Sequence, residues 1–475
     1  MPGPVNNPTW RRSELLRLLM LLLLVAATGM LLQTARPAGG RSRWPQVSTE
    51  TVLYGDLLYR LGQFVQRQSE LQPGISWYSG YLLSENGVGL WEREALRPQP
   101  DAAALLRVGL VYARNGYGEQ GREMLLAAGQ ADPERYSLYL GLAELYGGQH
   151  AVSRAGAVQL PPEESRWLRE LVEVDLLQAA GQTEAARTAL EEMRRHQDQF
   201  GLVLVALLLV VVLLCLVGGV VVVRWLALRL FTLRPRRYRA PLSVPWGLRE
   251  VTEVLVVLVF LLVLVSVGVT RLAPAAVHGP AGSTARPLLL VLAYVFQMGV
   301  VLLMVYSRAA QGSRPWRALG LRWPGLVPAV VQAMRAYGIL CCLALAAAWL
   351  LQRLGAGLLP AATSLLRGDE GWPGVALLFL LTVVLAPIAE EILFRGFVYG
   401  GLRTVMPTGS AAVASALIFS LAHLQPAPEA VAAIAAIGLA LALLYERTRS
   451  VVPGMLLHAL HNLLVFTILL VGTSL

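Results

Sequence analysis

Lysine is absent from this sequence of 475 residues, so all 40 of its basic residues are arginine. Charged residues are also scarce: they make up 15% of the chain against 56% hydrophobic residues, and the mean hydropathy is +0.56. A soluble domain carries about 25% charged residues. This shortage of charge excludes an ordinary cytosolic enzyme, because a protein core alone cannot bury so large an apolar excess.

Cysteine is rare as well. The three cysteines (Cys215, Cys341 and Cys342) lie inside apolar stretches, which gives no sign of a disulfide framework or a CxxC metal site. The formal net charge of +10 would favour a nucleic-acid partner in a soluble protein. Here the arginines gather at the ends of apolar runs, so we interpret them as topology signals and expect no nucleic-acid partner.

Apolar runs of about 18 residues or more predict membrane helices. The runs cover residues 15–32, 202–223, 251–270, 287–306, 328–351, 373–402, 409–424, 429–445 and 451–471. Arg11 and Arg12 precede the first run and no small-x-small cleavage site follows it, which favours an uncleaved anchor over a signal peptide. The predicted fold is an all-α, polytopic membrane protein.

Arginine in short loops marks the cytoplasmic side of a membrane. The loop 224–249 is the most basic, so alternation of the spans puts the amino terminus in the cytoplasm and both residues 33–200 and the carboxyl terminus outside. We therefore expect a multi-pass protein of a bacterial-type cell or inner membrane. Its predicted parts are an anchor (1–32), an extracytoplasmic helical domain (33–200), a second span with the basic loop (201–250) and a membrane domain of about seven spans (251–475).

The extracytoplasmic segment has a helical period. Between Ala102 and Pro133, small and apolar residues fall at the spacing of a tetratricopeptide repeat, and a weaker copy runs from Trp167 to His196. Small residues such as Gly109 would let two antiparallel helices approach closely. Two interpretations stay open, a plain helical bundle and a solenoid that binds a peptide or protein partner.

Charged residues inside spans need an explanation, because each costs about 2.5–3.5 kcal/mol at a helix centre. Glu446 lies at a span end, where we expect water to solvate it. Glu390, Glu391 and Arg395 lie in an apolar segment instead. Glu391 and Arg395 are one turn apart and can pair. Glu390 points about 100° away and lacks that partner, which suits proton handling. The alternative is a helix-packing network.

Histidines gather in the two spans that contain the other polar residues. Phe419 and His423 are one turn apart, and His458 shares a helix face with Asn462, flanked by His461. A lone membrane histidine usually makes a structural hydrogen bond, but here three of the chain's six histidines accompany the paired glutamates. Counted from the cytoplasmic ends of the spans, the predicted depths of the glutamates and of these polar residues overlap. We therefore expect them to line one cavity that is open toward the cytoplasm. This concentration favours an active site.

The order of these motifs resembles that of the CPBP (Abi) intramembrane proteases, which include the type II CAAX prenyl endopeptidases. The matching motifs are Glu390-Glu391-x-x-x-Arg395, Phe419-x-x-x-His423 and His458-x-x-x-Asn462. The resemblance is secure over about the last third of the chain.

The resemblance implies a role for each motif residue. Glu390 and His423 would activate a water molecule for attack on a peptide bond. His458 and Asn462 would hold the developing oxyanion. The residues that would orient the site are Glu391, Arg395 and Phe419. The resemblance also implies a membrane-associated or lipid-modified peptide substrate. Independently of it, we expect membrane lipid around the apolar spans and, on the solenoid interpretation, a protein partner of the tetratricopeptide-like segment.

The cofactor and the function each have an alternative. Zinc held by Glu390, His423 and His458 stays open, but the chain has no HExxH motif, so we favour a metal-free glutamate mechanism. A non-catalytic scaffold or bacteriocin-immunity-like protein could act through the extracytoplasmic helices. A transporter could use the same carboxylates as a proton relay.

Overall fold

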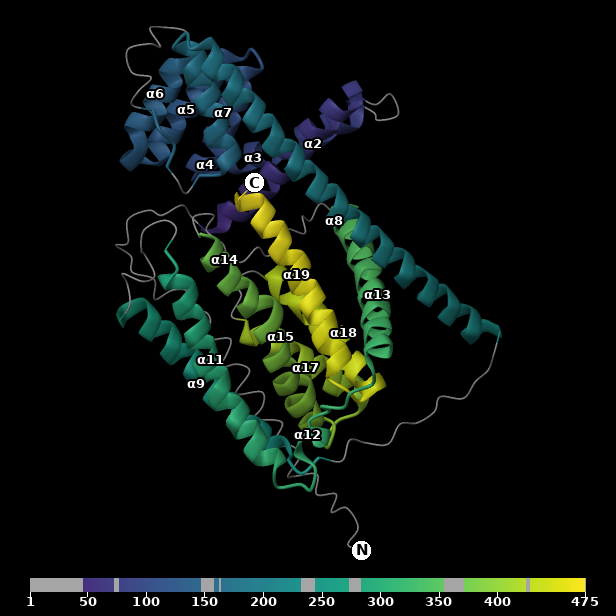
Figure 1. Cartoon of the computed structure of the whole chain (residues 1–475). Helices are drawn as coiled ribbons and strands as arrows, with labels where there is room; N and C mark the ends of the chain where they lie inside the picture. The colour runs from purple at the N-terminus through teal and green to yellow at the C-terminus, as the bar shows by residue number, and fades with distance from the viewer. Residues whose placement is uncertain are drawn as a thin grey trace, which may run out of the picture. The chain divides into compact units, whose positions relative to one another are not determined.

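The computed structural model describes residues 46–71, 77–146, 158–161, 164–231, 244–272, 283–353, 371–423 and 428–474. In these ranges the regular structure is helical and contains no strand, which confirms the all-α class (Figure 1). The predicted first span, 15–32, lies outside the described residues. Contacts divide the chain into two compact units, mainly residues 38–209 (the helical unit) and mainly residues 210–360 and 370–466 (the membrane unit).

The helical unit is a series of antiparallel hairpins. Its helices are α2 (Gln46–Leu71), α3 (Trp77–Ala95), α4 (Ala102–Arg114), α5 (Gly118–Ala131), α6 (Tyr136–Tyr146), α7 (Arg166–Ala179) and the first part of α8 (Thr183–Phe231). Where α4 meets α5, a Cβ added to Gly121 would lie 2.6 Å from the carbonyl oxygen of Gly109. The close approach expected from small residues is therefore present, and the tetratricopeptide identity stays a prediction.

A buried polar network joins three helices of this unit. Arg107 on α4 donates to Asp56 on α2 at 2.7 Å and to Glu164, just before α7, at 3.2 Å. Trp167 on α7 donates its indole N–H to the same Asp56 at 3.2 Å and stacks on Trp91. Because every buried charge in this network has an opposite charge beside it, the network fixes how these helices meet.

Helix α8 is continuous from Thr183 to Phe231 and passes without a break through residues 200 and 201, where the sequence placed a domain boundary. Its later part belongs to the membrane unit. There α8 crosses α13 (Leu326–Arg353) closely, since a Cβ added to Gly218 would lie 2.1 Å from the carbonyl carbon of Gly338. Two glycines thus bring these membrane helices into backbone contact.

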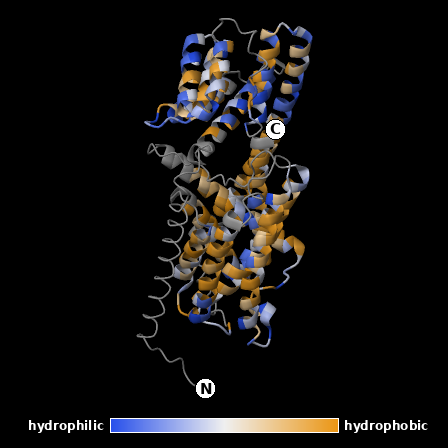
Figure 2. Ribbon diagram, turned by 90° about the vertical axis from the view of Figure 1, so that its left-hand side faces the viewer, coloured by the Kyte–Doolittle hydropathy of each residue, from blue (hydrophilic) through white to orange (hydrophobic). Residues whose placement is uncertain are grey.

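Seven of the described helices are long and apolar enough to cross a membrane. They are Thr183–Arg224, Leu248–Val269, Ala285–Ala309, Leu326–Ala346, Trp372–Leu402, Val431–Thr448 and Val452–Leu470, and a shorter apolar helix covers Thr408–Ala422. In Figure 2 their ribbons are orange along most of their length. The chain is a multi-pass membrane protein, as the sequence predicted.

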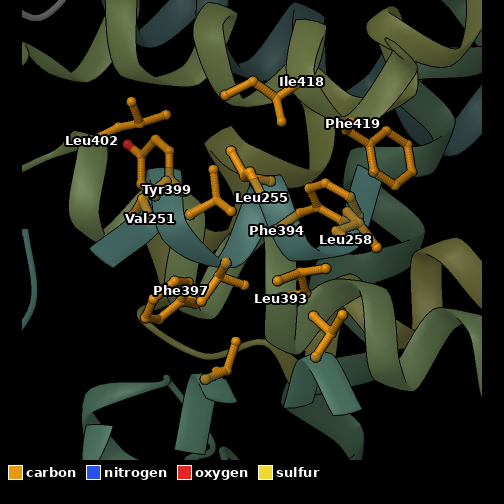
Figure 3. Packing of buried hydrophobic residues seen from close by; sticks show 14 of the residues in the cluster. Val251, Leu255, Leu258, Leu393, Phe394, Phe397, Tyr399, Leu402, Ile418 and Phe419 are labelled. Atoms are coloured by element: carbon orange, nitrogen blue, oxygen red, sulfur yellow. The ribbon is translucent and has the colours of Figure 1, made fainter. Parts of the chain in front are cut away.

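The membrane unit packs around the helical run Trp372–Leu402. Its other described helices are α9 (Leu248–Leu272), α11 (Ala285–Ala309), α12 (Pro315–Ala318), α13, α17 (Thr408–Ala422), α18 (Pro428–Thr448) and α19 (Val452–Ser474). Figure 3 shows Leu255 and Leu258 of α9 packing with Leu393 and Phe394 of that run. This apolar core lies directly beside the paired glutamates and fixes their helix.

The run Trp372–Leu402 is not a uniform α-helix. It contains α14 (Trp372–Phe379), a π-helical segment η3 (Leu380–Leu385), α15 (Ala386–Glu390), a second π-helical segment η4 (Glu391–Tyr399) and α16 (Gly400–Leu402). Pro387 follows η3 and has no N–H to donate, so the ordinary hydrogen-bond ladder cannot continue through it. π-helical turns are often found at functional sites.

Candidate active site

Three side chains from three helices converge inside the membrane unit. Glu390 ends α15, His423 follows the last turn of α17, and His458 lies in α19. The Oε2 atom of Glu390 is 3.8 Å from Nε2 of His423 and 3.9 Å from Nε2 of His458. Residues separated by up to 68 positions, 390 and 458, are thus brought together at almost equal distances around one carboxylate oxygen.

The carboxylate of Glu390 is enclosed, with 14% of its side chain exposed. Its Oε2 atom is buried and has no hydrogen-bond partner among the described residues. Buried polar atoms normally have a partner, protein or water. A water molecule held between Oε2 and the two imidazoles would satisfy all three groups, because each gap is slightly too long for a direct hydrogen bond.

Tyr294, on α11, is a contributor that the sequence did not reveal. Its hydroxyl donates to Oε1 of Glu390 at 3.3 Å. Glu390 therefore has one oxygen held by a phenol and the other directed at the histidines. Tyrosine is common in membrane helices and carries no formal charge, so nothing in its spacing marked it as part of the site.

Glu391 and Arg395 form the pair expected from their spacing. Oε1 of Glu391 is 2.8 Å from Nη1 of Arg395, and both side chains are fully buried. Arg395 also donates to the carbonyl oxygen of Gly438 on α18 at 3.2 Å, and its guanidinium lies 4.2 Å from the ring centroid of Phe419. The ion pair neutralises both charges inside the protein, and the contacts of Arg395 tie this helix to α17 and α18.

His458 lies between the two glutamates. Its Nε2 faces Glu390, and its Nδ1 is 3.4 Å from Oε1 of Glu391. One turn earlier, Gly454 leaves room for Glu391, since a Cβ there would lie 2.6 Å from Oε2 of that carboxylate. The ring of Phe419 meets the His458 ring edge-on, with the centroids 5.8 Å apart.

His423 is held in one tautomer. Its Nδ1 is 2.7 Å from the carbonyl oxygen of Phe419, and because a carbonyl can only accept, Nδ1 carries the hydrogen. In the neutral ring Nε2 is then a free base directed toward Glu390. The side chain is 31% exposed, so His423 is the most accessible of the three converging groups.

Asn462 and His461 make contacts of a different kind. Asn462 donates to the carbonyl oxygen of Thr382 at 2.8 Å. In the π-helical register of η3, where Ala386 N–H bonds Leu381, the next donor for Thr382 would be Pro387, which has none. Asn462 therefore replaces a missing backbone donor and keeps a second amide hydrogen. The Nδ1 atom of His461 is 3.2 Å from the Tyr337 hydroxyl, on α13.

Glu446 differs from its sequence expectation. It is buried, 8% exposed, and accepts a hydrogen bond from the Tyr399 hydroxyl at 3.0 Å. Arg449 donates to it at 2.9 Å, and Arg403 lies 3.5 Å away. The expectation of a solvated span end was wrong, because the arginines counted as topology signals fold back onto this carboxylate.

Glu390, His423 and His458 are of the residue types that bind zinc. Among the described residues, no group of three or more His, Cys, Asp or Glu side chains is arranged to hold one. Oε2 of Glu390 is 3.8 Å and 3.9 Å from the two Nε2 atoms. These distances are longer than the separation of about 3.3 Å between ligands that lie about 2.0 Å from a tetrahedral zinc ion.

Comparison with known families agrees with this geometry. The family model described as Type II CAAX prenyl endopeptidase Rce1-like matches residues 372–464. That segment begins with α14, ends in α19 and includes the two glutamates and both imidazoles of the site. No curated protein and no solved structure matches the chain. The part of the membrane unit that carries the site is therefore similar to the type II CAAX prenyl endopeptidases of the Rce1-like family.

Proposed function

We propose that the chain is an intramembrane endopeptidase that hydrolyses a peptide bond with a water molecule activated by Glu390 and His423. The observation that carries the proposal is the buried Oε2 atom of Glu390, 3.8 Å and 3.9 Å from two imidazole nitrogens. A carboxylate and an imidazole at those positions can both accept hydrogen bonds from one water, which aims its lone pair away from them.

In the proposed reaction, Glu390 takes one proton from the water as its oxygen attacks the peptide carbonyl. The second hydrogen of the water bonds to Nε2 of His423. Glu390 then returns the proton to the leaving amine as the C–N bond breaks, so the carboxylate is regenerated. The Tyr294 hydroxyl holds Glu390 in place throughout. General acid–base catalysis of this kind contributes about 10²–10⁴-fold to a rate.

The oxyanion would be stabilised by His458 and by the second amide hydrogen of Asn462. A doubly protonated His458 has a hydrogen on each nitrogen, so it can donate to Glu391 and to the oxyanion together. Donors fixed in a site that excludes bulk water are effective at this task. Arg395 neutralises Glu391 and leaves Glu390 as the carboxylate free to handle protons.

The substrate would be a membrane-associated or lipid-modified peptide that enters from the cytoplasmic side. The motifs lie in apolar helices, so the scissile bond must reach them within the membrane. The side follows from the arginine-rich loops, which mark the cytoplasmic face. The Glu390 site then cuts a peptide bond near that face.

The test compares membranes containing wild-type protein with membranes containing Glu390→Gln. The variant keeps the shape of the side chain but cannot take a proton, so cleavage should fall by about 10²–10⁴-fold while the protein still inserts. Quantitative proteomics should find a membrane peptide that accumulates uncut only with the variant. Glu253→Gln, which alters a half-buried carboxylate on α9 outside the glutamate site, is the matched control and should cleave normally.

Three results would contradict the proposal or its mechanism. Cleavage that persists in Glu390→Gln at the wild-type rate would remove the catalytic role of this carboxylate. If activity were lost after exhaustive chelation and restored by zinc, the metal-free mechanism would be wrong. Function that survives Glu390→Gln but requires residues 46–195 would favour the scaffold alternative.

A further inference from the structure

A half-open groove lies in the membrane unit, separate from the glutamate site. Helices α8, α13 and α18 line about 1180 Å³ of space there, and most of the lining side chains are leucine, valine, alanine and isoleucine. None of Glu390, Glu391, His423 or His458 lines it. The lining is that of a site for hydrocarbon rather than for water or a metal ion.

The polar lining residues all lie at one end of the groove. Arg224 is at the carboxyl end of the lining part of α8, Gln332 and Arg335 are at the amino end of that part of α13, and Arg447 is at the carboxyl end of that part of α18. The close crossing at Gly218 and Gly338 holds α8 and α13 together, and α13 also packs on α18. The groove is thus apolar and has a cationic end.

Its length matches one leaflet of a bilayer. On α13 the lining extends from Gln332 to Ala344, which corresponds to about 18 Å along a helix. Half of the hydrocarbon core of a membrane is about 15 Å. A single acyl chain can therefore lie along the groove while its headgroup reaches the arginines at the cationic end.

The positive charges of Arg224 and Arg335 favour an anionic ligand at this end of the groove. Arg335 lies inside the span Leu326–Ala346, where a positive charge is costly unless something neutralises it. None of the described lining residues is acidic. The Oε1 atom of Gln332 is buried and has no hydrogen-bond partner among the described residues, so this end also offers an acceptor to a hydroxyl donor.

We propose that the groove binds one anionic phospholipid with a hydroxylated headgroup, of the phosphatidylglycerol type. The phosphate lies between Arg224 and Arg335, a headgroup hydroxyl donates to Gln332, and an acyl chain follows the apolar lining of α8, α13 and α18. The bound lipid fills the gap between these helices and steadies α18, which supplies the carbonyl of Gly438 to Arg395. This lipid site does not depend on the proposed protease activity.

Native mass spectrometry of the purified full chain tests the proposal. The protein is titrated with phosphatidylglycerol and, separately, with phosphatidylcholine of the same acyl chains. One phosphatidylglycerol should bind more tightly than any phosphatidylcholine. Arg335→Gln and Arg224→Gln should each weaken that binding about fivefold, as expected for one arginine at a membrane surface.

Matched variants separate the groove from the rest of the surface. Arg249→Gln removes an exposed arginine that pairs with Glu253 on α9, outside the groove, and should leave phosphatidylglycerol binding unchanged. Ala440→Phe places a ring in the groove and should weaken binding. Ala432→Phe, at an exposed position of the same helix that does not line the groove, should not.

Several outcomes would overturn the proposal. Equal binding of the two lipids, or unchanged binding in both Arg335→Gln and Arg224→Gln, would show no anion selectivity in the groove. Inorganic phosphate that competes at the same concentrations as the lipid would indicate a free-anion site. If lipid bound only after residues 1–32 were removed, the occupant would be a segment of the chain itself.

Discussion

Glu390 and Glu391 are adjacent in sequence, but their surroundings are chemically different. Glu391 is fully buried and paired with Arg395, whereas Glu390 has one oxygen bonded by Tyr294 and one facing His423 and His458. The first arrangement neutralises a charge and the second leaves a carboxylate able to take a proton. The different contacts of Glu390 and Glu391, and not their positions in the sequence, therefore make them chemically different.

At the scale of single residues, the hydrogen bond from Tyr294 to Glu390 leads to a testable prediction. Tyr294→Phe removes only the hydroxyl that donates to Glu390, so the carboxylate loses a hydrogen bond but the packing of α11 is kept. A hydrogen bond to a charged group contributes about 1.5–3 kcal/mol, so kcat should fall by about ten- to a hundredfold with little change in KM. Steady-state kinetics on the peptide found by proteomics measures both constants.

Tyr306 provides the control on the same helix. It is 37% exposed and its ring packs at a tilt against Trp316, far along α11 from Tyr294, so Tyr306→Phe should keep wild-type kcat. If Tyr294→Phe raised KM and left kcat unchanged, Tyr294 would contact substrate instead of positioning the carboxylate.

At the scale of elements, the site depends on close approach between α19 and the segment η4. Gly454 on α19 faces the carboxylate of Glu391, and one turn later His458 reaches both glutamates. One further turn along α19, Asn462 donates the hydrogen bond to the Thr382 carbonyl that Pro387 cannot donate. One face of α19 thus supports the π-helical distortion and presents an imidazole to the site.

This arrangement predicts that Gly454→Ala is damaging. The added Cβ would lie 2.6 Å from Oε2 of Glu391, so either α19 or the buried ion pair must move. Overpacking of this kind costs about 1–3 kcal/mol, and His458 would shift with its helix. We expect a lower unfolding temperature in detergent and at least about a tenfold loss of cleavage.

Gly409→Ala is the matched control, because a Cβ at this α17 position meets nothing within 4 Å. It should be neutral or stabilise the protein by up to about 1 kcal/mol, since alanine favours a helix. Equal effects of the two substitutions would mean that the contact between Gly454 and Glu391 is not what positions the site.

At the scale of the whole molecule, the open question is which side of the membrane each part occupies. The arginine distribution predicts that residues 33–200 are outside and that the loop 308–327 is in the cytoplasm. The proposed entry of substrate from the cytoplasm depends on this orientation.

Two single-cysteine variants test it in a protein whose three native cysteines are replaced by alanine. Gln130→Cys lies at an exposed position of α5 and Gln311→Cys at an exposed position after α11. A membrane-impermeant maleimide should label the first in intact cells and the second only after permeabilisation. Labelling of the second position alone in intact cells would reverse the topology, and with it the proposed side of cleavage.

The sequence alone determined the membrane class, the described spans and the residues worth examining, because charges and imidazoles are costly in apolar helices and therefore stand out. Spacing within one helix also determined the pair of Glu391 and Arg395, since neighbours one turn apart must meet. Only the tertiary structure decided which oxygen of Glu390 faces the histidines, that Tyr294 holds the other, and that Glu446 is buried. Those facts depend on contacts between helices distant in sequence and on π-helical turns, which the spacing of residues along one chain does not encode.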